Sequence, residues 1–138
     1  MTKIKFDPSH MKFMALFENI TKTSPKDCII EEKNIIFIVN PGNVGKAIGK
    51  KGVNVKKLEQ KLSKKIKIVE FNDDITIFTQ NMIYPLKNLE INMEGNEIII
   101  TGQDVKTKGL LIGRDSQNLQ KLQNRLKRYF KFEKIKVN

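Results

Sequence analysis

The 138 residues suffice for one domain or two small ones, and 26 basic against 15 acidic residues give a net charge of +11, which favours a polyanionic partner. With 39% apolar residues, no apolar run near the roughly 20 residues of a membrane helix and no N-terminal signal-peptide pattern, we expect a soluble, cytoplasmic protein without a membrane partner. The single Cys28 and the single His10 exclude an internal disulfide and are too few for structural zinc, so we expect no metal or other cofactor.

The first half of the chain predicts the element order αββααβ. An amphipathic helix is expected to begin at Asp7-Pro8, because both residues suit a helix start and apolar residues follow at positions 13, 16, 17 and 20. Apolar, β-rich runs at 28–31 and 35–39 predict a hairpin. A short helix at about 44–49, a longer one at 54–63 and an alternating strand at 65–68 complete the unit.

The second half predicts the same order. A helix is expected after Asp73-Asp74 and before Pro85, although residues 75–78 also have strand propensity. A helix cap is a better interpretation of the two aspartates than a catalytic carboxylate pair. Strands at 89–93 and 97–101, two further helices and a strand at 134–137 follow.

An internal repeat links the two halves. At an offset of 64 residues, seven identities fall within 18 positions. The residues Gly45, Ile48, Gly49, Asn54, Lys57, Leu58 and Leu62 recur as Gly109, Ile112, Gly113, Asn118, Lys121, Leu122 and Leu126. The repeat predicts two units of one architecture.

The glycine-rich segment 45–52 carries the clearest chemical pattern. Glycine lets a backbone turn tightly and approach a phosphate, and the following helix directs unpaired N–H groups at the loop. Lys50 and Lys51 add charge, and nine lysines between 44 and 67 are opposed only by Glu59, although such a run is also typical of the solvated face of a helix. The spacing matches neither a nucleotide-binding P-loop nor a dinucleotide-binding motif. We therefore expect a site for a sugar-phosphate backbone.

The segment Ile48-Gly49-Lys50-Lys51-Gly52 resembles the I-G-x-x-G signature of KH domains, and the αββααβ order resembles their type II arrangement. Two such units, with the stretch 78–85 opening the second, resemble the paired KH region of the NusA family of transcription factors. Bacterial members carry polymerase-binding and S1 domains with no counterpart in this sequence, so the chain is expected to be like the short archaeal form. The resemblance leaves open whether RNA polymerase is contacted directly.

This resemblance implies an α+β fold of two tandem type II KH domains, residues 1–71 and 72–138, each with a small three-stranded sheet and helices packed on one face. It implies a single-stranded RNA-binding protein, an elongation or termination factor on nascent RNA, with no enzymatic activity and no small-molecule substrate. A groove for about four nucleotides would have the 49–52 loop as its clamp and the 35–39 strand in its floor. The RNA-binding residues implied for the first unit are Lys46, Ile48, Gly49, Lys50, Lys51, Gly52, Val55, Lys56 and Lys57.

The second loop, residues 112–116, departs from the KH pattern. Its second glycine is replaced by Ser116, and Asp115 places a negative charge where a phosphate would approach. Ser116 suits an N-cap of the next helix, so a loop kept mainly for structure is an open alternative. We expect weaker RNA binding here, by Lys108, Ile112, Gly113, Arg114 and Ser116, with Arg125, Lys127 and Arg128 adding to a basic surface.

The short connection 71–73 contains no glycine or serine and begins with the apolar Phe71, so we expect two rigidly joined units. Two other functions remain open at this stage. The chain could be a ribosome-associated or RNA-assembly KH protein, or a basic adaptor that docks an acidic protein. His10 and Cys28 are expected to be structural.

Overall fold

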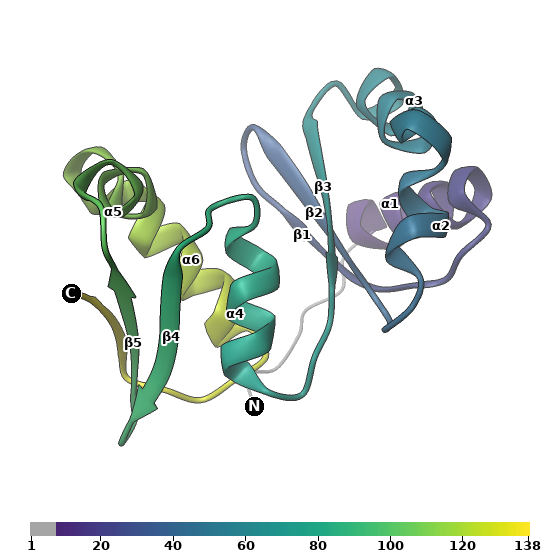
Figure 1. Ribbon diagram of the computed structural model, residues 1–138. Helices are drawn as coiled ribbons and strands as arrows, with labels where there is room; N and C mark the ends of the chain where they lie inside the picture. Colours follow the sequence, from purple (N-terminus) through teal and green to yellow (C-terminus); the bar gives the residue numbers. More distant parts are fainter. Residues whose placement is uncertain (1–7) are drawn as a thin grey trace. The chain divides into compact units, whose positions relative to one another are not determined.

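The computed structural model describes residues 8–138, and the chain divides into two compact units between Asn72 and Asp73 (Figure 1). The first unit contains α1 (Pro8–Thr21), β1 (Pro25–Ile30), β2 (Asn34–Val39), α2 (Val44–Ile48), α3 (Val53–Leu62) and β3 (Lys65–Glu70). The second contains α4 (Ile75–Ile83), β4 (Leu89–Glu94), β5 (Glu97–Gly102), α5 (Val105–Ile112), α6 (Gln117–Lys127) and β6 (Lys134–Val137). The predicted αββααβ order is confirmed in both units, while the predicted cap at Asp7 lies outside the described residues.

Each unit contains one mixed three-stranded sheet. β1 runs antiparallel to β2, and β2 runs parallel to β3; β4, β5 and β6 repeat this arrangement. Two parallel neighbours need a crossover connection, which the helix pairs α2–α3 and α5–α6 provide. The glycine loops therefore lie within the crossovers, between the two helices of each pair.

The helices of the first unit cover one face of its sheet (Figure 1). Phe17 from α1 stacks on Phe37 from β2, with ring centroids 4.4 Å apart. The fully or almost fully buried members of this core are Phe17, Cys28, Ile35, Phe37, Val39, Ala47 and Leu58. Burial of large apolar side chains, at about 25 cal/mol per Å², holds α1, α2 and α3 on the sheet.

Strand β2 is buried on both of its faces. Successive residues of a strand point to opposite faces, so Ile36 and Ile38 point away from the helices that cover Ile35 and Phe37. Their exposed fractions are only 1% and 0%. The uninterrupted apolar run 35–39 thus belongs to the central strand of a mixed sheet, where such runs are typical.

The second unit has its own core around α4 and α6. Phe78 from α4 meets Tyr129 edge to face, with ring centroids 5.5 Å apart, and Leu126 of α6 is fully buried. The cap of α4 is Asp74, whose side chain accepts hydrogen bonds from the hydroxyl and backbone N–H of Thr76, at 2.7 and 2.9 Å. These bonds, the hydroxyl first, hold the pKa of Asp74 below its usual value. The predicted helix and its aspartate cap are confirmed.

None of the helices between Pro8 and Asn138 combines the length and the apolar composition that a membrane crossing requires.

Candidate nucleic-acid interface

The glycine loop of the first unit is a single tight turn between α2 and α3. α2 ends at Ile48 with Gly49 as its C-cap, a 3₁₀ turn spans Lys50–Gly52, and α3 begins at once with Val53. Gly49 has φ 79° and ψ 169°, a region that is essentially open to glycine alone. A Cβ there would also approach the Asn54 side chain to 2.9 Å. The first glycine of the signature is therefore required by the backbone itself.

The second glycine of the signature is less strictly required. Gly52 has φ 73° and ψ 22°, in the left-handed helical region, and a Cβ on it would meet nothing within 4 Å. Its counterpart Ser116 adopts nearly the same conformation, with φ 60° and ψ 21°. A non-glycine residue thus adopts this conformation at some energetic cost, which explains how the second loop keeps the shape of the first without its second glycine.

An asparagine from the second helix ties each loop to the first helix. Asn54 Nδ2 donates to the carbonyl oxygen of Lys46 at 3.3 Å, and Asn118 Nδ2 donates to that of Leu110 at 2.9 Å. These carbonyls belong to the last turns of α2 and α5, where helix carbonyls lack intrahelical partners. In the sequence, both asparagines stand out only as repeat identities, and that recurrence is the one signal there for a shared structural role.

Positive charge surrounds the first loop. Lys46, Lys50, Lys51, Lys56 and Lys57 are all exposed, and the first turn of α3 contains no acidic residue. Gly52 at the N-cap has no side chain that could bond the first N–H groups of α3. These N–H groups and the positive end of the helix dipole therefore add to the positive electrostatic potential at the loop. An anion at this loop would therefore meet exposed ammonium groups beside the amino end of a helix.

The apolar residues beside this loop differ in part from those expected. Ile48 and Val55 are half-buried, so part of each side chain stays exposed. The prediction that the 35–39 strand forms the groove floor is wrong, because its five residues are at most 1% exposed and β2 is the central strand. The edge strand β3, which α2 and α3 both contact, offers the half-buried Ile66 and Ile68 instead.

In the second loop, Arg114, Asp115 and Ser116 are exposed, while Ile112 and Gly113 are half-buried. Ser116 occupies the N-cap position of α6, as predicted, but its side chain makes no capping hydrogen bond. The left-handed conformation explains this, because capping serines have extended backbones. Lys108 is half-buried, and its Cγ lies 2.7 Å from where a Cβ on Gly102 would be. Its aliphatic stem therefore packs on the backbone of β5.

Three further basic residues predicted for the surface of the second unit lie at the end of α6 and at its C-cap. Arg125, Lys127 and Arg128 are all half-buried. The ammonium group of Lys127 lies 5.6 Å from the centroid of the Phe132 ring, within range of a cation–π interaction. The side chain of Lys127 is therefore partly engaged within its own unit, whereas Lys50 and Lys51 are exposed.

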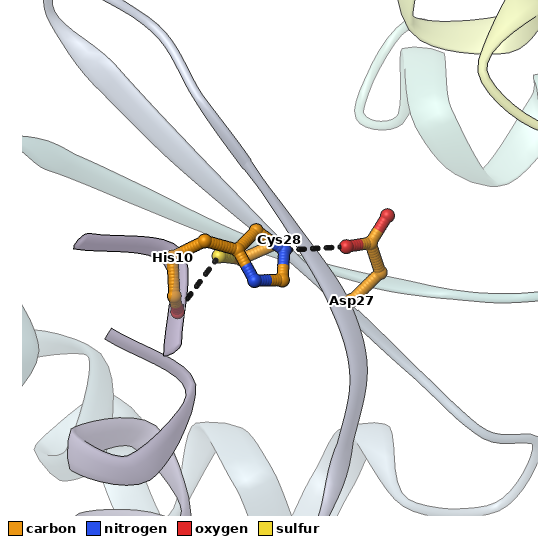
Figure 2. Close-up of polar contacts among 3 residues, drawn as sticks. All are labelled: His10, Asp27 and Cys28. Atoms are coloured by element: carbon orange, nitrogen blue, oxygen red, sulfur yellow. Dashed lines mark hydrogen bonds and ion pairs between the residues drawn. The ribbon is translucent and has the colours of Figure 1, made fainter. Parts of the chain in front are cut away.

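His10, Asp27 and Cys28 lie close together but do not form a catalytic arrangement (Figure 2). His10 Nε2 is 2.7 Å from Asp27 Oδ1, and the Cys28 thiol contacts the backbone oxygen of His10, not its ring. All three residues are at most 4% exposed, so a substrate could not reach them. Within residues 8–138, no group of three His, Cys, Asp or Glu side chains could hold a metal ion. The predicted burial of Cys28 in a strand is confirmed.

The fold and the loop define a KH-domain protein, and comparisons with known proteins agree. The family model described as KH domain matches residues 14–83. The chain is 32% identical over 140 residues to "Probable transcription termination protein NusA" of Methanocaldococcus jannaschii, covering 99% of this chain and 76% of that protein. It is 26% identical over 137 residues to the protein of the same name from Halococcus morrhuae, covering 98% and 99%.

A solved structure shows the same architecture. The crystal structure of APE1850 superimposes with a TM-score of 0.77 at 25% identity, covering 96% of this chain and 100% of that one. The chain belongs to the archaeal NusA-type family of KH-domain proteins. KH domains are RNA-binding modules, and this family is not enzymatic.

Proposed function

We propose that this protein binds single-stranded RNA through the loop from Gly49 to Gly52 and acts on nascent transcripts as an elongation or termination factor. The observation that carries the proposal is the exposure of Lys50 and Lys51 on a tight turn at the amino end of α3. The turn brings backbone N–H groups, a helix dipole and two ammonium groups to one place. Phosphates of an RNA backbone are the ligands that this combination suits.

The half-buried apolar residues beside the loop support a single-stranded partner. Ile48 and Val55 belong to the two helices that flank the loop, and Ile66 to the neighbouring edge strand. Unpaired bases can lie against such residues, whereas the bases of a duplex are stacked on one another and inaccessible. Lys46, Lys56 and Lys57 extend the positive surface along the two helices.

The second loop is proposed as a weaker contact. It has the turn of the first loop, with Gly113 at φ 75° and ψ 172°, and it exposes Arg114. The exposed Asp115 opposes a phosphate at the position that Lys51 occupies in the first loop. One RNA strand would then be held mainly by the first unit and guided by Arg114, Lys108 and Ile112 in the second.

The link to transcription comes from the relatives, whose printed names describe probable transcription termination proteins. We infer from them a cytoplasmic role close to RNA polymerase, on RNA as it emerges. Co-purification of the full chain with RNA polymerase supports this role. Co-purification with ribosomal subunits alone supports the ribosome-associated alternative instead.

The RNA proposal is tested by comparing a short single-stranded RNA with an RNA duplex of equal total charge, using fluorescence anisotropy across a salt series. The single strand should bind more tightly. Four to six phosphate contacts imply a log–log salt slope of roughly −3 to −4. Equal affinity for the duplex argues for nonspecific basic binding, and a flat salt response contradicts the phosphate contacts.

A further inference from the structure

A second surface of the first unit lies away from the glycine loop. A groove of about 620 Å³ runs between α1 and α3, and none of its lining residues belongs to the segment 45–52. Its lining residues are Lys12, Phe13, Ala15, Leu16, Asn19, Lys61 and Leu62. The groove is a feature of the helix layer and plays no part in the RNA site proposed above.

The floor of the groove is apolar. Phe13, Leu16 and Leu62 pack on the core of the unit yet stay only half-buried, so one side of each faces the groove. Ala15 is exposed and its side chain is small, so the side of the groove formed by α1 is shallow at this position. Met11 is 66% exposed and lies one turn before Ala15 on the same helix. The apolar surface therefore continues along α1 beyond the groove itself.

The rim of the groove is positive. Lys12 on α1 and Lys61 on α3 are exposed on its two walls, and no acidic residue between Pro8 and Asn138 lines it. The nearest acids on these helices are engaged elsewhere: Glu18 accepts a hydrogen bond from the Ser24 hydroxyl at 3.2 Å, and Glu59 accepts one from the backbone N–H of Ile66 at 3.3 Å. An apolar floor between two cations is thus the pattern that an occupant must match.

We propose that this groove docks an acidic amphipathic helix of a protein partner. Such a helix would place apolar side chains, spaced at i, i+3, i+4 and i+7, on the floor and carboxylates beside Lys12 and Lys61. A second copy of this chain is a poorer occupant, because two molecules of charge +11 repel each other. An RNA strand is also a poorer occupant, because two lysines offer few phosphate contacts and the apolar floor would stay unfilled.

The test uses the full chain, labelled with ¹⁵N, and a designed acidic peptide of about 16 residues, long enough to be partly helical, with leucines at i, i+3, i+4 and i+7. A scrambled peptide of the same composition is the comparison. Amide shifts should concentrate in α1 and the last turn of α3 with the patterned peptide and be weaker with the scrambled one. The proposal would be overturned if both peptides caused equal shifts, or if the shifts centred on the glycine loop. It would also be overturned if single-stranded RNA, and not the patterned peptide, shifted the amides of the groove.

Two variants test separately the contribution of the lysines and that of the apolar floor to peptide binding. Lys12→Glu with Lys61→Glu should weaken binding of the patterned peptide at least about tenfold, while Lys33→Glu with Lys87→Glu, exposed lysines outside the groove, should have a smaller effect. Ala15→Gln, an exposed helical position, should weaken it by placing a polar group over the floor. RNA affinity should stay within about threefold for Ala15→Gln. Unchanged peptide affinity in both groove variants contradicts the docking surface.

Discussion

Asn54 reaches back across the glycine loop and donates a side-chain hydrogen bond to the carbonyl oxygen of Lys46, and Asn118 makes the same bond to Leu110 in the second unit. In both units the first glycine of the loop lies directly beside this asparagine, since a Cβ on Gly49 or Gly113 would approach the asparagine side chain to 2.9 or 2.6 Å. The glycine and the asparagine thus form one structural pair. The pair fixes how α3 follows α2, and so where Lys50 and Lys51 stand.

Asn54→Ala should therefore weaken RNA binding without unfolding the unit. A lost hydrogen bond of about 0.5–1.5 kcal/mol corresponds to roughly two- to twelvefold in affinity if it all serves to hold the loop. Fluorescence anisotropy with single-stranded RNA measures the effect, and circular dichroism checks the helices. Asn118→Ala, the matched change in the second unit, should have a smaller effect on RNA. Equal losses for both variants would contradict the primary role of the first loop.

The second loop can be restored to the family pattern by Asp115→Gly with Ser116→Gly. Both residues have positive φ, 55° and 60°, which costs about 1–2 kcal/mol for a residue with a Cβ. Glycine removes this strain but adds backbone entropy to the unfolded chain. Since Ser116 makes no capping bond, we expect unchanged or slightly higher stability in thermal unfolding. RNA affinity should rise because a negative charge is removed; an unchanged or lower affinity would show that this loop does not face RNA.

Much of the architecture could be predicted from the sequence because local patterns and the repeat agree. Helical spacing of apolar residues, the alternating strand before residue 70 and the repeat offset of 64 all indicate the same αββααβ unit. The weak helix α4 was also predicted correctly, because the parallel with the first unit outweighed the strand propensity of residues 75–78. Asp74 then supplied a helix cap that local sequence could indicate.

The features that sequence could not supply depend on tertiary structure. The 35–39 run is apolar in any arrangement, and only the strand order shows that it is central and buried, with β3 at the edge. Serine before a helix usually predicts a cap, but the left-handed backbone of Ser116 turns its side chain away from that role. The hydrogen bond from Asn54 to Lys46 joins residues eight apart across a turn. The periodicity of apolar residues in a helix does not indicate such a bond.

The cap of α4 gives a prediction for acid stability. The folded-state pKa of Asp74 lies below its ordinary value of 3.8, mainly through the Thr76 hydroxyl, so its contribution is present above that pH and is lost as pH falls through the folded pKa. Asp74→Asn keeps a capping side chain but does not titrate. As the pH is lowered below 3.8, the unfolding free energy of the Asp74→Asn variant should therefore decrease less than that of the natural chain. Urea titration at several pH values measures both. Asp73→Asn, the exposed neighbour that is not the cap, should keep the natural acid dependence; a loss of that dependence would contradict the assignment.

The two units are expected to unfold together. Only residues 71–74 separate the end of β3 from the start of α4, and each unit is small enough to be marginally stable alone. Leu126→Ala, at a fully buried site of the second unit, should cost about 2–5 kcal/mol and lower the unfolding temperature of both units. Amide hydrogen exchange of the full chain reports each unit separately, with Leu58→Ala as the reciprocal change. Unaltered protection of β2 in the Leu126→Ala variant would show that the units are independent.

The most direct test of the account is the RNA affinity of Lys50→Asp with Lys51→Asp. Both side chains are exposed, so the fold should be unchanged by circular dichroism, while the affinity for single-stranded RNA should fall at least about tenfold, or 1.4 kcal/mol. Lys33→Asp with Lys87→Asp makes the same change in net charge at two exposed positions outside the loop and should cost less than about threefold, and Arg114→Asp should also cost less than the loop change. A loop variant whose affinity stays within about threefold of the natural chain, roughly 0.7 kcal/mol, would place the RNA site elsewhere and contradict the account.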